Sequence, residues 1–345
     1  MSHEQKHDHG EEHYRISHCH APEEKKRQLN RLARVIGHLQ HVKRMIEEDR
    51  DCAEVLVQLS ATRSALTGLG KEIINEHIAH CITHAVEDGD MEAIEEFRKA
   101  IENVAAHFSA NALLALGGSS AMVEDMSEVP QFVKVADGLL VNTGTVTKAQ
   151  TEAMRAAVSH ANSLGRPWAL DPAGVGALPL RTFTVKELMR RFPSIIRGNA
   201  SEIAFLAGAE TAGRGVESTI SSDEVMQAAP RLAGVTRAAV LVTGAVDYVA
   251  AEGAPLVAVC NGSPLMARVN GVGSVQGAVA AAFLGTLGGR ARWESALAAS
   301  LVVSVAGEIA AAKGKTLGAF PAAFIDALDA VTPEDLVKRG KVKVG

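Results

Sequence analysis

The chain has 345 residues, a formal net charge of −5 and 47% apolar residues. This length exceeds that of a typical single domain, and the apolar content suffices for buried cores, so we expect a soluble protein of two domains. The negative charge argues against a general attraction to nucleic acid, and the most apolar stretch, residues 296–307, is too short to span a membrane. We therefore expect a cytoplasmic protein with no membrane partner.

Histidine and cysteine are concentrated at the start of the chain. Six of the thirteen histidines lie within residues 1–20, among acidic residues and without an apolar period, so this arm is predicted to be flexible. The four cysteines of an intracellular chain favour metal ligands or buried thiols over a disulfide framework.

Helices are predicted over residues 21–101. Pro22 suits a first helical turn, and apolar residues recur at helical spacing from Leu29 to Ile46. Asp51 can cap a second helix that extends to about residue 84. A third helix is expected from about Met91, and its apolar pattern continues without a flexible linker, so the boundary between the two domains is predicted to be helical.

The second predicted helix carries metal-ligand residues at both ends. His77 and Cys81 are four residues apart and share one helical face, while Cys52 lies at the start of the helix. The two ends of a helix of roughly 40 Å cannot bind one metal within one subunit. If two copies pair antiparallel, Cys52 of one copy meets His77 and Cys81 of the other, a set that suits Cu(I), Ni(II) or Zn(II).

The first predicted helix is strongly basic. Seven basic residues and no acidic residue lie between Lys25 and Arg44. Arg27, Arg31 and Arg34 share one face that can neutralise phosphates, although an isolated charge run is more often a solvated face. Together with the ligand pattern, this face favours DNA binding.

This N-terminal part resembles the CsoR/RcnR family of metal-sensing repressors over about residues 17–101. The matching runs are Arg31-Leu-Ala-Arg-Val-Ile-Gly-His-Leu-Gln, residues 43–52, residues 58–63 and His77-Ile-Ala-His-Cys81. The resemblance implies an all-α three-helix domain whose metal ligands are Cys52, His77, Cys81 and, from the arm, His20 or alternatively His18. With His20 the set is most similar to nickel sensors, whereas copper sensors use three ligands. The resemblance also implies operator DNA as a partner, bound by the basic faces of a four-helix dimer core; the candidate residues are Arg27, Arg31, Arg34, Lys43, Arg44 and Arg63.

Residues 102–345 are predicted to form an α/β domain. Strand-like runs at 138–141, 168–170, 238–242 and 256–259 alternate with amphipathic helical runs, so we expect a mostly parallel sheet with helices on both faces. Gly271, Gly273 and Ser274 lie at a helix start, where backbone N–H groups can bind a phosphate. Asp171 and Glu202 follow apolar runs, where ligand sites are usual, although either can instead cap a helix.

Taken together, these motifs resemble hydroxyethylthiazole kinase, a ribokinase-like enzyme of thiamine salvage, over about residues 103–330. The matches are Phe108-Ser-Ala-Asn-Ala-Leu-Leu-Ala-Leu-Gly, Ala121-Met-Val, Asn142-Thr-Gly-Thr, Trp168-Ala-Leu-Asp-Pro, Ile196-Arg-Gly-Asn-Ala-Ser-Glu-Ile, Val242-Thr-Gly-Ala-Val-Asp-Tyr and Gly318-Ala-Phe. The resemblance implies that Arg197 and Thr243 contact ATP, that Met122 and Gly271 contact hydroxyethylthiazole, and that Asp171 and Glu202 lie beside Mg²⁺. The expected reaction transfers the γ-phosphate of ATP to the primary hydroxyl of the thiazole, while the helix start offsets the developing charge.

The chain departs from the kinase pattern at two places. Ser274 stands where the family usually has a cysteine, and a neutral hydroxyl is a poorer proton acceptor than a thiolate, so slower catalysis is expected. The family's opening helix and first strand are absent, a loss that can leave an open sheet edge.

We therefore predict a hydroxyethylthiazole kinase fused to a metal-responsive DNA-binding repressor. The alternative is a metal-sensing repressor whose truncated kinase-like domain is inactive and serves ligand binding or assembly. A third hypothesis is a kinase whose front domain only stores metal. Retention of Asp171, Arg197, Glu202 and Thr243 favours the first.

The two resemblances also imply different homo-oligomers. The helical domain implies a dimer or tetramer and the kinase domain a trimer, and both cannot close in one small symmetric particle. Because the first strand is missing, we expect the trimer to be the weaker assembly.

Overall fold

The computed structural model describes residues 22–52, isolated positions between 54 and 73, and residues 108–345 apart from 145, 209–221 and 270. The chain divides into two compact units, residues 1–99 and residues 100–345, and each is described by itself.

The first unit begins with helix α1, Pro22–Glu47. This helix buries Val35, Val42 and Met45, and the described positions from Cys52 to Ile73 are also helical and bury Leu69. Most of the apolar stripe that predicted α1 is exposed in a single copy, by 38% to 59%; these residues are Leu29, Leu32, Ile36, Leu39 and Ile46. The first two predicted helices are therefore present as far as the structure describes them, whereas the expected start of the third lies outside the described residues.

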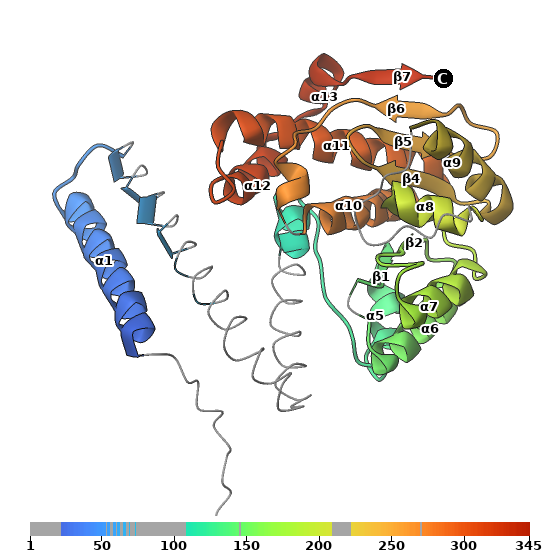
Figure 1. The fold of residues 1–345 in the computed structure, drawn as a ribbon, viewed down its shortest axis with the longest axis horizontal. Helices are drawn as coiled ribbons and strands as arrows, with labels where there is room; N and C mark the ends of the chain where they lie inside the picture. The colour runs from blue at the N-terminus through green and yellow to red at the C-terminus, as the bar shows by residue number, and fades with distance from the viewer. Residues whose placement is uncertain are drawn as a thin grey trace, which may run out of the picture. The chain divides into compact units, whose positions relative to one another are not determined.

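The second unit contains a sheet of seven strands in the order in which they follow along the chain (Figure 1). They are β1 Leu139–Asn142, β2 Trp168–Asp171, β3 Ile195–Asn199, β4 Ala239–Thr243, β5 Asp247–Ala250, β6 Val257–Val259 and β7 Val342–Val344. Strands β1 to β4 pair in parallel, and β5 to β7 are added antiparallel. Among the described residues β1 pairs only with β2, so it forms one edge of the sheet, as the loss of the family's first strand predicts.

Helices cover both faces of this sheet, which confirms the predicted fold class. Their bounds are α5 Val129–Val135, α6 Lys148–Ser163, α7 Pro179–Met189, α8 Ala200–Leu206, α9 Ser222–Thr236, α10 Val272–Thr286, α11 Arg292–Lys313, α12 Phe320–Ala330 and α13 Pro333–Arg339, with a 3₁₀ turn η2 at Met266–Arg268. Alternate residues of a strand point to opposite faces. Accordingly Trp168 and Leu170 of β2 join a core with α5 to α9, while Ala169 joins a second core with α10 to α12.

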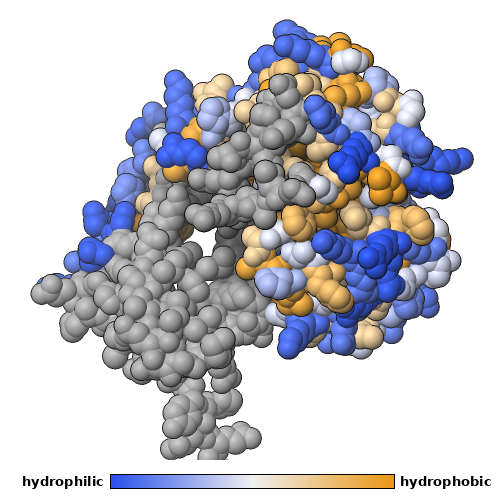
Figure 2. All heavy atoms as spheres, turned by 45° about the vertical axis from the view of Figure 1, so that its right-hand side comes forward, coloured by the Kyte–Doolittle hydropathy of each residue, from blue (hydrophilic) through white to orange (hydrophobic). Residues whose placement is uncertain are grey.

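Helix α11 is the one helix of the described residues that is long and apolar enough to span a membrane. It extends beyond the apolar stretch 296–307, but Ala299, Val303 and Ala306 are buried in the second core against α10 and α12. On the face of the molecule in Figure 2, apolar residues form separate patches between hydrophilic ones. Helix α11 is therefore a core helix of the α/β unit.

Helix α10 lies unusually close to the backbone that enters β1. A Cβ atom on Gly285 would lie 2.9 Å from the carbonyl carbon of Asp137 and 3.0 Å from the amide nitrogen of Gly138. A Cβ atom on Gly138 would collide with the carbonyl oxygen of Ala281 in α10. Only glycine fits at these two positions.

Replacing Gly138 by alanine should therefore force α10 away from the sheet. We expect Gly138→Ala to lower the free energy of unfolding of the second unit by about 1–3 kcal/mol, the usual cost of overpacking, as measured by urea denaturation. Gly234→Ala is the matched control, because no atom of the described residues lies within 4 Å of the added Cβ in helix α9. This control should gain up to about 1 kcal/mol; equal effects of the two substitutions would contradict close packing at Gly138.

Candidate functional site

Four polar side chains converge where the parallel strands end. Asn142, Asp171 and Thr243 are the last residues of β1, β2 and β4, and Arg197 lies in β3 two residues before its end. The register pairs Asn142 with Asp171 and aligns the end of β3 with Thr243. The carboxyl ends of such strands are the usual position of ligand sites in open α/β sheets.

Asp171 is the centre of this cluster and is almost completely buried. Its Oδ2 accepts hydrogen bonds from Asn142 Nδ2 at 3.0 Å and from Arg197 Nη1 at 3.3 Å. Arg197 also donates from Nη2 to Thr243 Oγ1 at 3.1 Å. Asp171 Oδ1 and Arg197 Nε are buried and have no hydrogen-bond partner within the described parts of the chain. Buried atoms of this kind are costly unless a ligand or ion completes them.

The surroundings of Asp171 favour its protonated form. Burial raises the pKa of the Asp171 carboxyl to about 6, and the charge of nearby Glu202 adds to this increase. The Arg197 guanidinium and the Asn142 amide act in the opposite direction, because both stabilise the carboxylate. A cation bound beside Oδ1 would stabilise the charged form further.

The start of helix α10 lies directly against the cluster. Gly271 precedes the helix with φ of 94°, a left-handed conformation that favours glycine, and it has no side chain to cap the first turn. A Cβ atom on Gly273 would lie 2.9 Å from Arg197 Nη2, and one on Gly277 would lie 3.3 Å from Asp171 Oδ2. Of the predicted residues, Gly273 thus lies beside Arg197, and Gly271 and half-buried Ser274 flank it in the chain. The first N–H groups of the helix have no partner within it.

Glu202 caps a helix and also lies near Asp171, the two roles expected for it from the sequence. It forms a capping box with Asn199 at the start of α8, and its Oε2 accepts a hydrogen bond from the Asn199 N–H at 2.8 Å. Its Oε1 accepts a hydrogen bond from the Gly174 N–H at 2.9 Å. Glu202 therefore ties the loop after β2 to the end of β3 and also raises the local negative charge beside Asp171.

This arrangement fits a magnesium–nucleotide complex. Carboxylate oxygens are the ligands that Mg²⁺ prefers, and Asp171 Oδ1 is an unpartnered carboxylate oxygen within the described parts of the chain. A guanidinium, a hydroxyl and a helix start without side chains are the groups that bind phosphate oxygens. The cluster can therefore hold a polyphosphate with its cation.

Met122 lies outside the strand ends, whereas Asn142 is part of the cluster. Met122, predicted to contact the substrate, lies in the irregular segment before α5 with 54% of its side chain exposed, so its role stays a prediction. Sequence reasoning assigned no role to Asn142. Its amide donates a hydrogen bond to Asp171 and accepts one from the Gly144 N–H. The signal that could have found it is a polar residue at the end of an apolar run, the same signal that identified Asp171.

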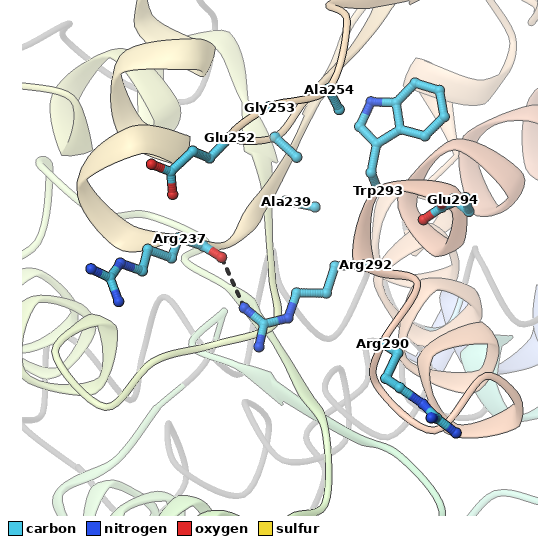
Figure 3. A pocket seen from close by; sticks show the side chains of 10 residues that line it. Arg237, Ala239, Glu252, Gly253, Ala254, Arg290, Arg292, Trp293 and Glu294 are labelled. Carbon is cyan, nitrogen blue, oxygen red and sulfur yellow. Dashed lines mark hydrogen bonds between the residues drawn. The ribbon is translucent and has the colours of Figure 1, made fainter.

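A hollow elsewhere in the second unit has different chemistry. It is lined by residues including Arg237, Glu252, Arg292, Trp293 and Glu294, and it lies by Ala239, at the opposite end of β4 from Thr243. Figure 3 shows the Arg292 guanidinium turned toward the Arg237 carbonyl oxygen, to which it donates at 2.9 Å. The hollow carries both acidic and basic side chains, and Arg292 is bound to a backbone carbonyl, so its chemistry differs from that of the cluster around Asp171.

The predicted metal set of the first unit is described only in part. Cys52 is an exposed free thiol at the start of the second helix, while His20, His77 and Cys81 lie outside the described residues. Within the described ranges, no three histidine, cysteine or acidic side chains gather as a metal site. The set of four ligands stays a prediction.

The predicted DNA-binding face is present on α1. Arg27, Arg31, Arg34 and Arg44 are exposed, whereas Arg63 lies outside the described residues. Lys43 is exposed as well and forms an ion pair of 3.5 Å with Glu47. Three arginines at intervals of four and three residues lie on one side of a helix, and their role in DNA binding stays a prediction.

Comparison with known proteins places these two units in two families. A model described as the hydroxyethylthiazole kinase family matches residues 97–334, and one described as a metal-sensitive transcriptional repressor matches residues 24–103. A hydroxyethylthiazole kinase from Tolumonas auensis is 45% identical over 233 residues, which cover 67% of this chain and 87% of that protein. A hydroxyethylthiazole kinase from Klebsiella pneumoniae is 48% identical over 226 residues, which cover 66% of this chain and 86% of that protein. The structure of a hydroxyethylthiazole kinase protein from Pyrococcus horikoshii OT3 has a TM-score of 0.63 and 32% identity, covering 69% of this chain and 88% of that chain.

The raised pKa of Asp171 has a measurable effect on stability. A carboxyl that binds its proton more tightly in the folded state contributes stability at low pH. This contribution is lost as the pH rises from 3.8, the ordinary pKa of an aspartate, through about 6, the pKa of Asp171 in the folded protein. The amide of an Asp171→Asn variant does not titrate, so from pH 4 to pH 8 the unfolding free energy of this variant should rise relative to wild type by about 2–3 kcal/mol. Denaturant unfolding without Mg²⁺ or nucleotide measures this difference.

A control separates burial from the loss of a charge. Asp137→Asn removes a carboxylate that is 84% exposed and forms only a surface ion pair of 3.8 Å with Arg166, so its stability should differ little from wild type over this pH range. If Asp171→Asn instead loses stability relative to wild type as pH rises, the pairing with Arg197 outweighs burial and the assignment is wrong.

Proposed function

The chain belongs to the hydroxyethylthiazole kinase family and carries a metal-sensitive transcriptional repressor domain in front of the kinase domain, and from this premise we propose which residues perform each function. The substrates are ATP and hydroxyethylthiazole, and the product is the thiazole phosphate of thiamine salvage. The observation that carries this proposal is the cluster of buried Asp171 with partly buried Arg197 and Thr243 against the start of α10.

The chain's own residues bind and orient the phosphates. The Arg197 guanidinium and the Thr243 hydroxyl contact the nucleotide, and the first N–H groups of α10, from Val272 to Ser274, face the charge that develops on the γ-phosphoryl group. Asp171, with Glu202 behind it, holds Mg²⁺. When bound, Mg²⁺ neutralises the phosphate oxygens.

Ser274 is proposed to face the primary hydroxyl of the thiazole. Its hydroxyl can accept a hydrogen bond from the attacking alcohol, but it is a weaker proton acceptor than a thiolate. Positioning and electrostatic stabilisation supply most of the rate enhancement in phosphoryl transfer, so this chain retains the principal contributions. Retention of the whole cluster therefore supports an active kinase over a domain used only for binding or assembly.

The repressor domain is proposed to sense Ni(II) or Cu(I) and to bind operator DNA through α1. Cys52, His77, Cys81 and His20 are the proposed ligands, shared between copies. The exposed apolar stripe of α1, from Leu29 to Ile46, supports assembly, because such a stripe at helical spacing usually packs against another helix. We propose a dimer or tetramer through this domain, and a cytoplasmic location.

Turnover tests the kinase proposal directly. Full-length protein incubated with ATP, Mg²⁺ and hydroxyethylthiazole should release ADP and thiazole phosphate, as followed by ³¹P NMR. Asp171→Ala should lower kcat at least about 100-fold, because it removes the Mg²⁺ ligand and leaves Arg197 without its buried counter-charge. Gly234→Ala controls for the effects of purification, because Gly234 lies in α9, which contributes no residue to the cluster. Wild-type turnover no faster than that of Asp171→Ala would refute the kinase assignment.

DNA binding tests the sensor proposal. Fluorescence anisotropy with the DNA upstream of the chain's own gene should show an affinity that Ni(II) or Cu(I) lowers about 5-fold to 150-fold, the usual range of allosteric coupling. Cys52→Ala should bind DNA equally with and without the metal, because one ligand is lost. Cys260→Ala is the matched control, since Cys260 lies in the kinase unit beside β7. Absence of DNA binding, or equal metal responses of both variants, would contradict sensing through Cys52.

A further inference from the structure

A second buried carboxylate lies close to the cluster but outside it. Asp247 is the first residue of β5 and is 6% exposed. Its Oδ1 accepts a hydrogen bond from the Gly244 N–H at 3.0 Å. Its Oδ2 accepts hydrogen bonds from Gln276 Nε2 at 2.7 Å and Ser300 Oγ at 2.8 Å. One side chain therefore joins the β4–β5 turn, helix α10 and helix α11.

Burying Asp247 carries an energetic cost that these contacts only partly offset. Its three donors are neutral, and no ion pair to Asp247 is present within the described residues. Burial raises the pKa of the carboxyl, while its hydrogen bonds and the more distant charge of Arg197 lower it. A buried carboxylate without an ion-pair partner is an expensive way to stabilise a fold. Its contacts show what it holds in place.

Two of the three contacts lead into the phosphate site. Gly244 directly follows Thr243, whose hydroxyl accepts the hydrogen bond from Arg197. Gln276 lies in the second turn of α10 and immediately precedes Gly277, which faces Asp171. Asp247 thus connects the two walls between which Arg197 lies, the end of β4 and the start of α10. The third contact, Ser300, anchors this connection to α11, which contributes no residue to the cluster.

We propose that Asp247 is a positioning residue for phosphoryl transfer: it holds the turn after β4 and the first turns of α10 in a fixed relation, so that Thr243, Arg197 and the α10 N–H groups face one phosphate. This role rests on the proposed kinase function. Misplacing catalytic groups by about 1 Å can cost about 100-fold in rate, so a rigid connection between the two walls has a kinetic effect.

Three substitutions test the contacts separately. Asp247→Asn keeps the size of the side chain but places an amide N–H against at least one of the three donors. Gln276→Leu removes only the contact with α10. Ser300→Ala removes only the contact with α11 and serves as the matched control.

The expected kinetic result is a split between kcat and KM. Measured well below the melting temperature, Asp247→Asn should lower kcat about 10-fold to 100-fold and Gln276→Leu about 10-fold, with KM for hydroxyethylthiazole within about threefold of wild type. A variant that combines Asp247→Asn with Gln276→Leu should lose little more kcat than Asp247→Asn alone, because both substitutions act through the same hydrogen bond. Ser300→Ala should keep kcat and KM within about twofold. Equal losses of kcat in Asp247→Asn and Ser300→Ala, at equal folded fraction, would overturn the proposal.

Amide hydrogen exchange gives a readout that does not depend on turnover. Asp247→Asn should increase exchange in residues 244–247 and 271–277 more than Ser300→Ala does. If exchange increases equally over the whole unit in both variants, Asp247 is a general stabilising residue and the positioning role is wrong. Should the wild-type protein fail to turn over, the kinase proposal fails, and this comparison still decides whether Asp247 aligns the two walls.

Discussion

The ion pair between Asp171 and Arg197 is the interaction on which the rest of the kinase unit depends. It joins β2 to β3 at their carboxyl ends, and the third member of the cluster, Thr243, extends the connection to β4. Burial destabilises the charged form of Asp171 and raises its pKa. Shifts of this kind are common at functional sites, where a bound ligand can stabilise the charge. The parallel register and the glycines of α10 bring charged groups together that would separate in an unfolded chain.

The two units present their polar groups in different ways. The kinase unit gathers them at strand ends that hydrogen bonds of the sheet align. The repressor unit presents an exposed thiol, exposed arginines on α1 and an exposed apolar helical stripe. One chain therefore combines a polar cluster at aligned strand ends with a helical unit whose thiol and apolar stripe are exposed in a single copy.

Sequence reasoning identified the elements whose signals are local. Asp171 ends an apolar run and Pro22 begins α1, as expected, whereas the helix expected after the Gly271 to Ser274 segment begins earlier, at Val272 within that segment. Asn142 and Asp247 received no role, because their partners lie 29 or more residues away for the contacts that matter and depend on strand register and helix packing. Strands β5 and β7 were not singled out either, since each is short and β7 is exposed along its length. The apolar stripe of α1 could be predicted from the spacing of its residues, but its exposure in a single copy could not, because exposure depends on tertiary packing.

The close approach of Gly138 and Gly285 limits how the kinase unit can respond to its ligands. Helix α10 lies against Arg197 and Asp171 at one end and against the chain entering β1 near the other, where backbone touches backbone without intervening side chains. Backbone atoms in contact cannot change rotamer to absorb a displacement, so this end of α10 is held rigidly against the chain that enters β1. We therefore expect any closure around a nucleotide to come from the loops that follow the strands, with helix α10 as the fixed point.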